Sequence, residues 1–120
     1  MAQYSQLSIY NKAFEVLREL HQRVPKFSKQ YKYFLGGRLI ETNVEIIRLI
    51  IKANSERTRE RRTALIDNLC AASESLIIHL RIANELRQLG KQSAYLYLCE
   101  KVVDLSKQAE GWKKYAPQNS

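Results

Sequence analysis

The stretch SAYLYLCEKVVDLSKQAEGWKK, residues 93–114, places apolar side chains at spacings that alternate between three and four residues. These positions are Tyr95, Leu98, Val102, Leu105, Ala109 and Trp112. A repeat of about 3.5 residues is typical of a helix packed lengthwise on other helices. A half-buried strand would alternate with a period of two, which this stretch does not do.

Three upstream segments show the same helical period, over about residues 8–24, 29–53 and 58–89. Ser28 is a candidate N-cap for the second segment, and Gly90 is a C-terminal stop for the third. The predicted core rows are Tyr10, Ala13, Leu17, Leu20 and Val24; then Gly37, Ile40, Val44, Ile47 and Ile51; then Leu65, Leu69, Ala72, Leu76, Ala83 and Leu86. Four rows joined by short loops predict an all-α, antiparallel up-down-up-down four-helix bundle. We expect one domain over residues 1–120, with a loose tail at 117–120.

Composition points to the kind of partner. The formal net charge is +8, from 20 Lys and Arg against 12 Asp and Glu. Such basicity favours a polyanion such as nucleic acid, and less strongly an anionic membrane surface. We expect a cytoplasmic protein, since no secretory signal is visible and the apolar runs are too short to span a membrane. Cys70 and Cys99 are interpreted as small core residues, although a bridge between them stays open.

The second helical segment has a wider apolar surface than one bundle core should cover. Leu35, Leu39, Ile46, Leu49 and Ile50 lie outside both its predicted core row and its polar stripe. Exposed apolar surface of this size usually marks a protein partner, and a homo-oligomer supplies one economically. The predicted oligomer interface is Leu35, Leu39, Ile46, Ile50, Ile77 and Ile78. The alternative is irregular packing within a single bundle.

Positive charge gathers at one end of the predicted bundle. No acidic residue occurs from Leu20 to Ile40, and Lys29 and Lys32 oppose the dipole of the helix that they begin. Tyr31 and Tyr33 interleave with these lysines and could stack on bases. The predicted nucleic-acid-binding residues are Arg23, Lys26, Lys29, Lys32, Arg81, Arg87 and Lys91. The alternative is a solubilising surface. The opposite end mixes both signs from Glu56 to Arg62, which is typical of self-paired charges.

Arg81 stands in the apolar run Leu76–Ala83, and its guanidinium always carries charge. One interpretation pairs it with Glu85, one helical turn further on. The other has Arg81 facing a second subunit or a phosphate.

No catalytic constellation is evident in the chain. A di-iron bundle needs inward-pointing Glu-x-x-His pairs, and neither His21 nor His79 has a glutamate three residues earlier. The chain also lacks His-Glu-x-x-His and Cys-x-x-Cys motifs. We therefore expect no catalytic residue, no metal and no cofactor, and a protein that is not an enzyme.

Several short motifs, taken in order, resemble a known family. They are Val24-Pro25-Lys26, the helix that begins Tyr33-Phe34-Leu35-Gly36, the run Leu80-Arg81-Ile82-Ala83-Asn84-Glu85-Leu86, and Gly111-Trp112. Over about residues 10–112 the chain resembles the accessory variability determinants of diversity-generating retroelements, which are small four-helix-bundle proteins. It departs from them at Glu110, where the family often has a glycine or another small residue.

The resemblance implies a ring-like pentamer that binds a reverse transcriptase and binds nucleic acid through a basic surface. Such a protein supports the copying of template RNA into mutagenised cDNA. Arg81 and Lys26 match basic positions of the family's motifs, and the resemblance thus favours a functional role for Arg81. A sister family, encoded in intervening sequences of ribosomal RNA genes, is less similar, because its Asn-x-x-Glu-Gly turn is replaced here by Ala53-Asn54-Ser55-Glu56.

The sequence therefore predicts a non-catalytic accessory protein that binds RNA and a reverse transcriptase. Two alternatives remain besides the sister family. One is a protein-interaction scaffold whose charge only keeps it in solution. The other is a basic protein of the membrane surface, which the filled core rows disfavour.

Overall fold

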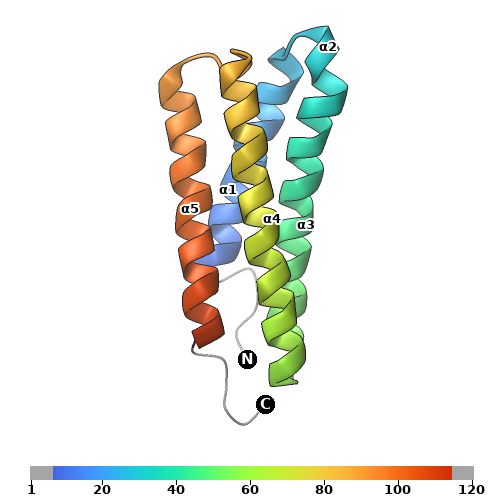
Figure 1. The fold of residues 1–120 in the computed structure, drawn as a ribbon, viewed down its shortest axis with the longest axis vertical. Helices are drawn as coiled ribbons and strands as arrows, with labels where there is room; N and C mark the ends of the chain where they lie inside the picture. Colours follow the sequence, from blue (N-terminus) through green and yellow to red (C-terminus); the bar gives the residue numbers. More distant parts are fainter. Residues whose placement is uncertain (1–6, 115–120) are drawn as a thin grey trace.

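The computed structural model describes residues 7–114, and within that range it contains helices and no strand. Four long helices lie along one axis: α1 (Ser8–Arg23), α3 (Gly37–Ser55), α4 (Arg59–Glu85) and α5 (Gln92–Lys114) (Figure 1). Between α1 and α3 the chain forms a 3-10 turn, Val24–Lys26, the short helix α2, Lys29–Tyr31, and a π-helical turn, Lys32–Gly36. The prediction of an all-helical bundle is confirmed. The tail expected at 117–120 lies outside the described residues.

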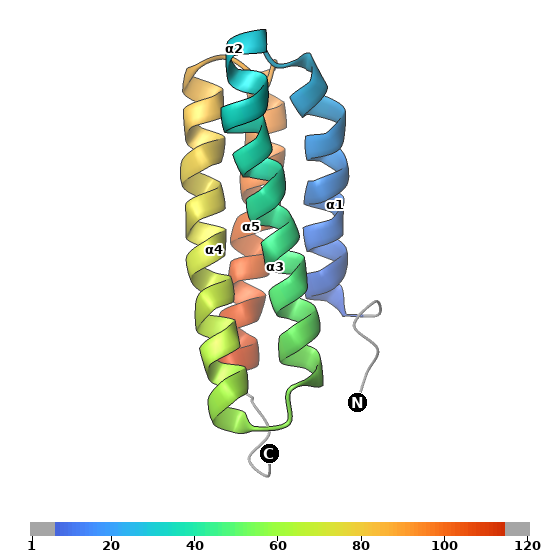
Figure 2. The ribbon, with the colours of Figure 1, turned by 90° about the vertical axis from the view of Figure 1, so that its right-hand side faces the viewer.

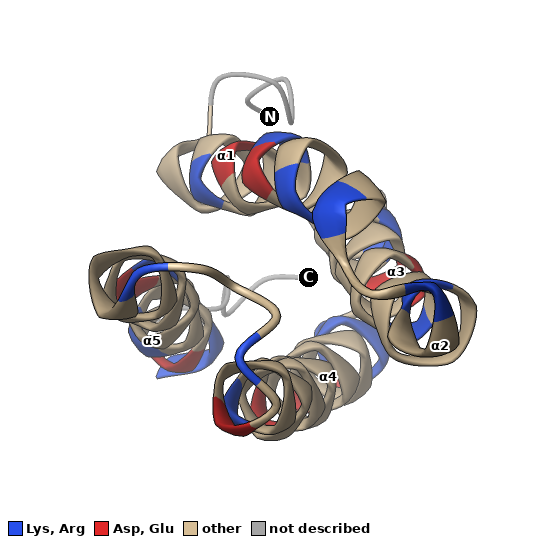
Figure 3. Cartoon of the chain, turned by 90° about the horizontal axis from the view of Figure 1, so that it is seen from above, with Lys and Arg blue, Asp and Glu red and all other residues tan. Residues whose placement is uncertain are grey.

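The path of the chain brings sequence neighbours side by side. In Figure 1 the chain turns at the top after α1, at the bottom between α3 and α4, and at the top again between α4 and α5. Figures 2 and 3 show the four helices around a common centre, where α3 packs on α1 and α4, and α5 packs on α4 and α1. The α1–α3 connection and the α4–α5 turn therefore lie at the same end of the molecule.

The core is filled from all four helices. In α5, four members of the predicted row, from Leu98 to Ala109, are fully buried, and Tyr95 and Trp112 pack against the core from its margins. Fully burying a leucine or valine side chain contributes roughly 1.5–3 kcal/mol, so these rows dominate the stability of the fold. The large side chains with least exposure are Leu20, Leu39, Ile46, Ile50, Ile66, Leu69, Leu76, Leu80, Leu89, Leu98, Leu105 and Val16.

The core face of α3 differs from the prediction. The predicted row at Gly37, Ile40, Val44, Ile47 and Ile51 is only half-buried, so it lies at the flank of the core. The buried row is Leu39, Asn43, Ile46, Leu49, Ile50 and Ala53. Apolar residues surround much of this helix, and α1 and α4 cover it from two sides. Spacing alone could not show which apolar row faces the centre.

The predicted oligomer interface is therefore wrong for most of its residues. Leu39, Ile46 and Ile50 are fully buried in the core of a single chain, and Leu35 is 9% exposed. Ile77 is also partly buried against that core. Of the predicted set only Ile78, on α4, is well exposed, at 58%. The wide apolar surface of α3 is covered by the neighbouring helices of the same chain.

The helix predicted over 29–53 is interrupted by the π-helical turn and extends to Ser55. Ser28 occupies the N-cap position, but its side chain makes no capping hydrogen bond. At Gly36 the backbone lies so close to the 3-10 turn that a Cβ atom would be 2.5 Å from Cγ1 of Val24. The turn therefore directs Leu35 and Gly36 inward and holds them against the end of α1.

α4 ends four residues earlier than the predicted 58–89, at Glu85. The N–H of Gln88 donates to Ala83 O and that of Arg87 to Asn84 O, both at 2.9 Å. This is the Schellman arrangement, in which the residue after the helix takes the left-handed conformation. Arg87 takes it, with φ 59°, although glycine is the usual residue. Gly90 also has a positive φ, 77°, but it lies in the turn beyond.

Two buried polar side chains tie elements together. Asn43 donates from Nδ2 to Ala13 O at 3.0 Å and links α3 to α1. Arg62, which is 6% exposed, donates from Nε to Glu56 O at 3.1 Å and also from Nη2 to the same oxygen. Arg62 therefore fixes the turn between α3 and α4.

Candidate nucleic-acid interface

The candidate interface is the end of the bundle where the α1–α3 connection meets the α4–α5 turn, which we call the basic end. It contains residues 23–38 and 87–91. Seen from above in Figure 3, Lys and Arg mark α2, the end of α1 and the turn between α4 and α5. The fold thus brings together two basic segments that lie about 50 positions apart in the sequence.

Two hydrogen bonds join these segments. Arg23 donates from Nη1 to Leu89 O at 3.1 Å. The backbone N–H of Ser28 donates to Gln88 Oε1 at 2.7 Å. Arg23 also forms an ion pair with Glu19, one turn earlier on α1. Arg23 was predicted to bind nucleic acid, but its observed partners give it a structural role at the base of the basic end.

The other basic residues at this end present their charge to solvent. Lys26, Lys29, Arg38, Arg87 and Lys91 are exposed, and Lys32 is half-buried. Among the described residues none of these six takes part in an ion pair. Charges that lack a protein partner keep their full attraction for a phosphate, because no intramolecular ion pair must break first.

Two aromatic rings stand among these cations. Tyr33 is 76% exposed and Phe34 is 87% exposed, whereas Tyr31 packs partly against the core. Interleaving with the lysines pointed to Tyr31 and Tyr33 but not to Phe34. Phe34 lies in the π-helical turn that interrupts the helix, and this turn places its ring outward. The spacing of apolar residues gives no sign of such a turn.

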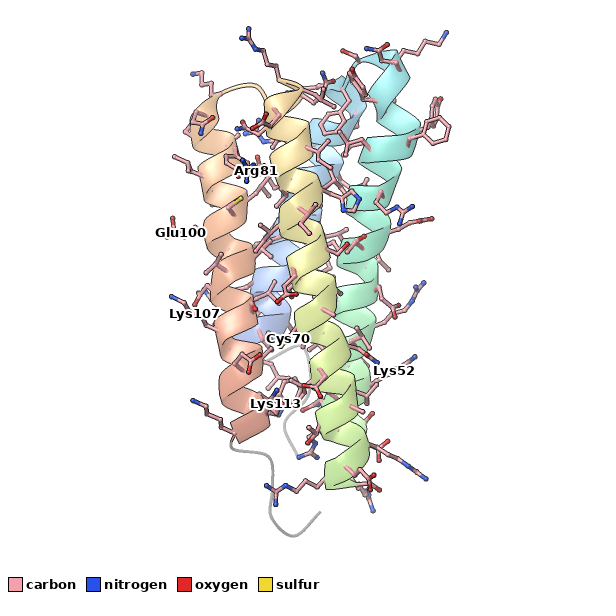
Figure 4. The ribbon with its side chains drawn as sticks, viewed as in Figure 1. Lys52, Cys70, Arg81, Glu100, Lys107 and Lys113 are labelled. Carbon is pink, nitrogen blue, oxygen red and sulfur yellow. The ribbon has the colours of Figure 1, made fainter. Side chains whose placement is uncertain are left out.

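Arg81 lies on the exposed side of α4, toward the upper end of the bundle in Figure 4, with 74% of its side chain exposed. Its Nε is 3.8 Å from Oε1 of Glu85, so the intrahelical pairing is present. An exposed ion pair of this kind contributes at most about 1 kcal/mol and opens readily. Arg81 and Glu85 border a shallow hollow of about 470 Å³ that is lined by Ile78, Ile82 and Leu86.

The opposite end uses its charges differently. Arg62 is buried against the α3–α4 turn. Lys113 Nζ lies 2.9 Å from Asp67 Oδ1 and 3.7 Å from Glu110 Oε2. Several cations of that end, including Lys52, remain exposed (Figure 4). The two ends therefore carry similar residue types. At the basic end Arg23 alone forms an ion pair among the described residues, whereas at the lower end Lys113 lies close to two carboxylates.

The two cysteines are half-buried free thiols on neighbouring helices. Burial, and then the nearby Glu110 carboxylate, raise the pKa of Cys70 to about 11. Burial likewise raises the pKa of Cys99. Both thiols are therefore protonated at neutral pH. Within residues 7–114 no group of three metal-ligating side chains comes together, and no helix is both long and apolar enough to cross a membrane.

Comparison with models of known protein families finds none that matches this chain, and comparison with curated proteins finds no match either.

Proposed function

We propose that this protein is a non-catalytic, RNA-binding accessory of a reverse transcriptase, as the resemblance to the accessory variability determinants implies. In this proposal an antiparallel four-helix bundle assembles into a ring of identical subunits in the cytoplasm. The ring presents several basic ends to template RNA and holds the polymerase nearby. Each weak contact after the first becomes intramolecular, so repetition raises the overall affinity.

The observation that carries the proposal is the set of cations at the basic end. Lys26, Lys29 and Lys32 come from a segment without any acidic residue, and none of them forms an ion pair in the described part of the chain. Arg87 and Lys91 join them from the α4–α5 turn. Lysine and arginine contacts to phosphates supply affinity with little sequence readout, so RNA shape and the polymerase would provide the specificity.

Assembly needs an interface other than the predicted one. Three large exposed apolar residues line one face at the end of α4, spaced four residues apart: Ile78 and Ile82 within the helix, and Leu86 directly after it. Arg81 and Glu85 flank them with one charge of each sign. A face with both signs and an apolar centre suits contact with another subunit, where Arg81 would leave Glu85 for a partner.

The same face supports one alternative function, a protein-interaction scaffold. In that case the hollow beside Arg81 binds a different protein, and the lysines of the basic end only keep the protein in solution. The two functions differ in their response to nucleic acid.

The test is the affinity of the full chain for a structured RNA and for an equal-length DNA duplex, measured over a range of salt concentrations. The proposal predicts binding that weakens steeply with salt and that favours the RNA. An absence of RNA binding at low salt would reject the proposal and leave the scaffold.

A further inference from the structure

We propose that the turn carrying Tyr33 and Phe34 is a stacking platform for the bases of single-stranded RNA. This inference rests on the proposed function, because it specifies which form of RNA the basic end takes. It also accounts for two exposed rings that the packing of the bundle does not use.

Tyr33 and Phe34 are consecutive in the sequence, and both rings are nearly free of intramolecular cover. Phe34 is the more exposed of the two, at 87%, and Tyr33 follows at 76%. A single exposed aromatic is ordinary on a protein surface. Two consecutive ones, within a stretch of unpaired lysines, form a local surface with both apolar faces and positive charge.

The platform has a fixed base. Directly after the rings, Leu35 and Gly36 are buried, and a Cβ atom at Gly36 would be 2.5 Å from Val24 Cγ1 and 3.5 Å from Phe27 Cδ2. Because the backbone is held this closely, the π-helical turn keeps Tyr33 and Phe34 on the outside. π-helical turns within helices often occur at functional sites. A rigid base lets the rings bind without first being ordered.

Gly37 keeps the platform uncovered. A Cβ atom at this position would meet nothing within 4 Å. Helical side chains lean toward the N-terminus and cover the preceding turn, which here is the turn of Tyr33 and Phe34. Glycine disfavours the helix relative to alanine, and no packing contact at position 37 requires it. We attribute the glycine at this position to the need to leave the surface beside the two rings open.

The charges around the rings favour RNA as the occupant. Lys29 and Lys32 precede them and Arg38 follows one turn after Phe34; none of these cations has an ion-pair partner within residues 7–114. Phosphates would lie against the cations while bases stack on the rings. In a duplex the faces of the bases are already stacked on one another, so only a single strand can use both features.

The experiment compares oligouridine with an RNA duplex of equal length, using the full chain and a Tyr33→Ala, Phe34→Ala double variant. The double variant should bind oligouridine at least about twentyfold more weakly, because two rings are removed and each stacked base contributes at least about fivefold. Its duplex binding and its dependence on salt should match the wild type, since the cations remain. Phe14→Ala, which removes a 44% exposed ring from α1, is the matched control and should change neither.

Three further variants keep an aromatic ring at positions 33 and 34 and all the cations. Gly37→Gln should weaken oligouridine binding by covering the turn, while Gly37→Ala should not. Phe34→Trp should lose indole fluorescence when oligouridine binds, beyond any change that Trp112 shows in the wild type.

If the double variant binds both RNAs as the wild type does, the platform is rejected although the basic end still binds RNA. If the double variant binds RNA normally but no longer binds a protein partner, the two rings form a protein-binding site, and the stacking platform is again rejected. If the wild type binds neither RNA at low salt, the proposed function fails with it.

Discussion

A Cβ atom at Gly36 would lie 2.5 Å from Cγ1 of Val24, closer than such atoms approach one another in proteins. The backbone at Gly36 therefore packs directly on the Val24 side chain, and this close approach holds the start of α3 against the end of α1. It also gives the adjacent glycines opposite roles, since a Cβ atom at Gly37 would meet nothing within 4 Å.

Replacing Gly36 with alanine should therefore destabilise the protein, because the 3-10 turn must move away from α3. Overpacking of this kind costs about 1–3 kcal/mol. Gly37→Ala is the matched control and should stabilise by up to about 1 kcal/mol, since alanine favours the helix. Urea unfolding followed by circular dichroism measures both. Equal stabilities of the two variants would contradict the close packing at Gly36.

Arg62→Ala should destabilise the fold, because Glu56 O loses both of its guanidinium donors at the α3–α4 turn. We expect a loss of about 1–3 kcal/mol. Arg62→Lys should not restore the stability, since an ammonium group cannot donate from the same two positions. Arg61→Ala, at an exposed neighbour, should change the unfolding free energy by less than about 0.5 kcal/mol. If Arg61→Ala and Arg62→Ala have similar unfolding midpoints, the hydrogen bonds from the Arg62 guanidinium do not stabilise the fold.

Arg87→Gly should stabilise the protein by about 1 kcal/mol, because glycine takes the left-handed conformation without the steric cost that an L side chain pays. Arg87→Gln removes the same charge and keeps that cost, so it should leave the thermal midpoint nearly unchanged. Gly90→Ala should lower the midpoint, since its φ is also positive. Thermal unfolding of the three variants separates backbone strain from charge. If Arg87→Gly instead lowers the thermal midpoint, the backbone at Arg87 is not strained.

The Ile78→Asp, Ile82→Asp double variant should be smaller than the wild type in sedimentation and should keep its helical circular dichroism. Both side chains are exposed in the single chain, so the charges disturb only contacts between subunits. Ile46→Asp should unfold the protein instead, because Ile46 is fully buried in the core. A wild type that sediments as a monomer, or a double variant of unchanged mass, would rule out assembly through this face.

Much of the fold follows from apolar spacing where one apolar row is clearly distinguished from polar neighbours. The row from Leu98 to Ala109 is such a case, and it lies in the core as predicted. On α3 the apolar residues extend so far around the helix that spacing could not distinguish Ile46, in the core, from Ile47, at its flank. That choice depends on where α1 and α4 lie.

The candidate site was less predictable than the fold. The acid-free segment showed where positive charge gathers, but not that Arg23 would bond to Leu89 O and support the turn. The exposure of Phe34 depends on the π-helical turn and on the backbone packing of Gly36 against Val24 and Phe27, which residue spacing does not reveal. For Arg81, spacing identified Glu85 as a partner, and the structure places the two side chains 3.8 Å apart.

RNA binding by charge variants of the two ends of the bundle tests most directly whether the basic end is the binding site. One variant carries Lys26→Gln, Lys29→Gln and Lys32→Gln, and the other carries Lys52→Gln, Arg59→Gln and Arg61→Gln at the opposite end. Both lose three exposed or half-buried cations, so their net charges stay equal. Affinity for a structured RNA is then measured against salt concentration. If RNA binds at the basic end, only the first variant loses affinity and has a shallower salt dependence, because it makes fewer phosphate contacts. Equal losses in both variants would mean that RNA responds to net charge alone, and would contradict a binding site at the basic end.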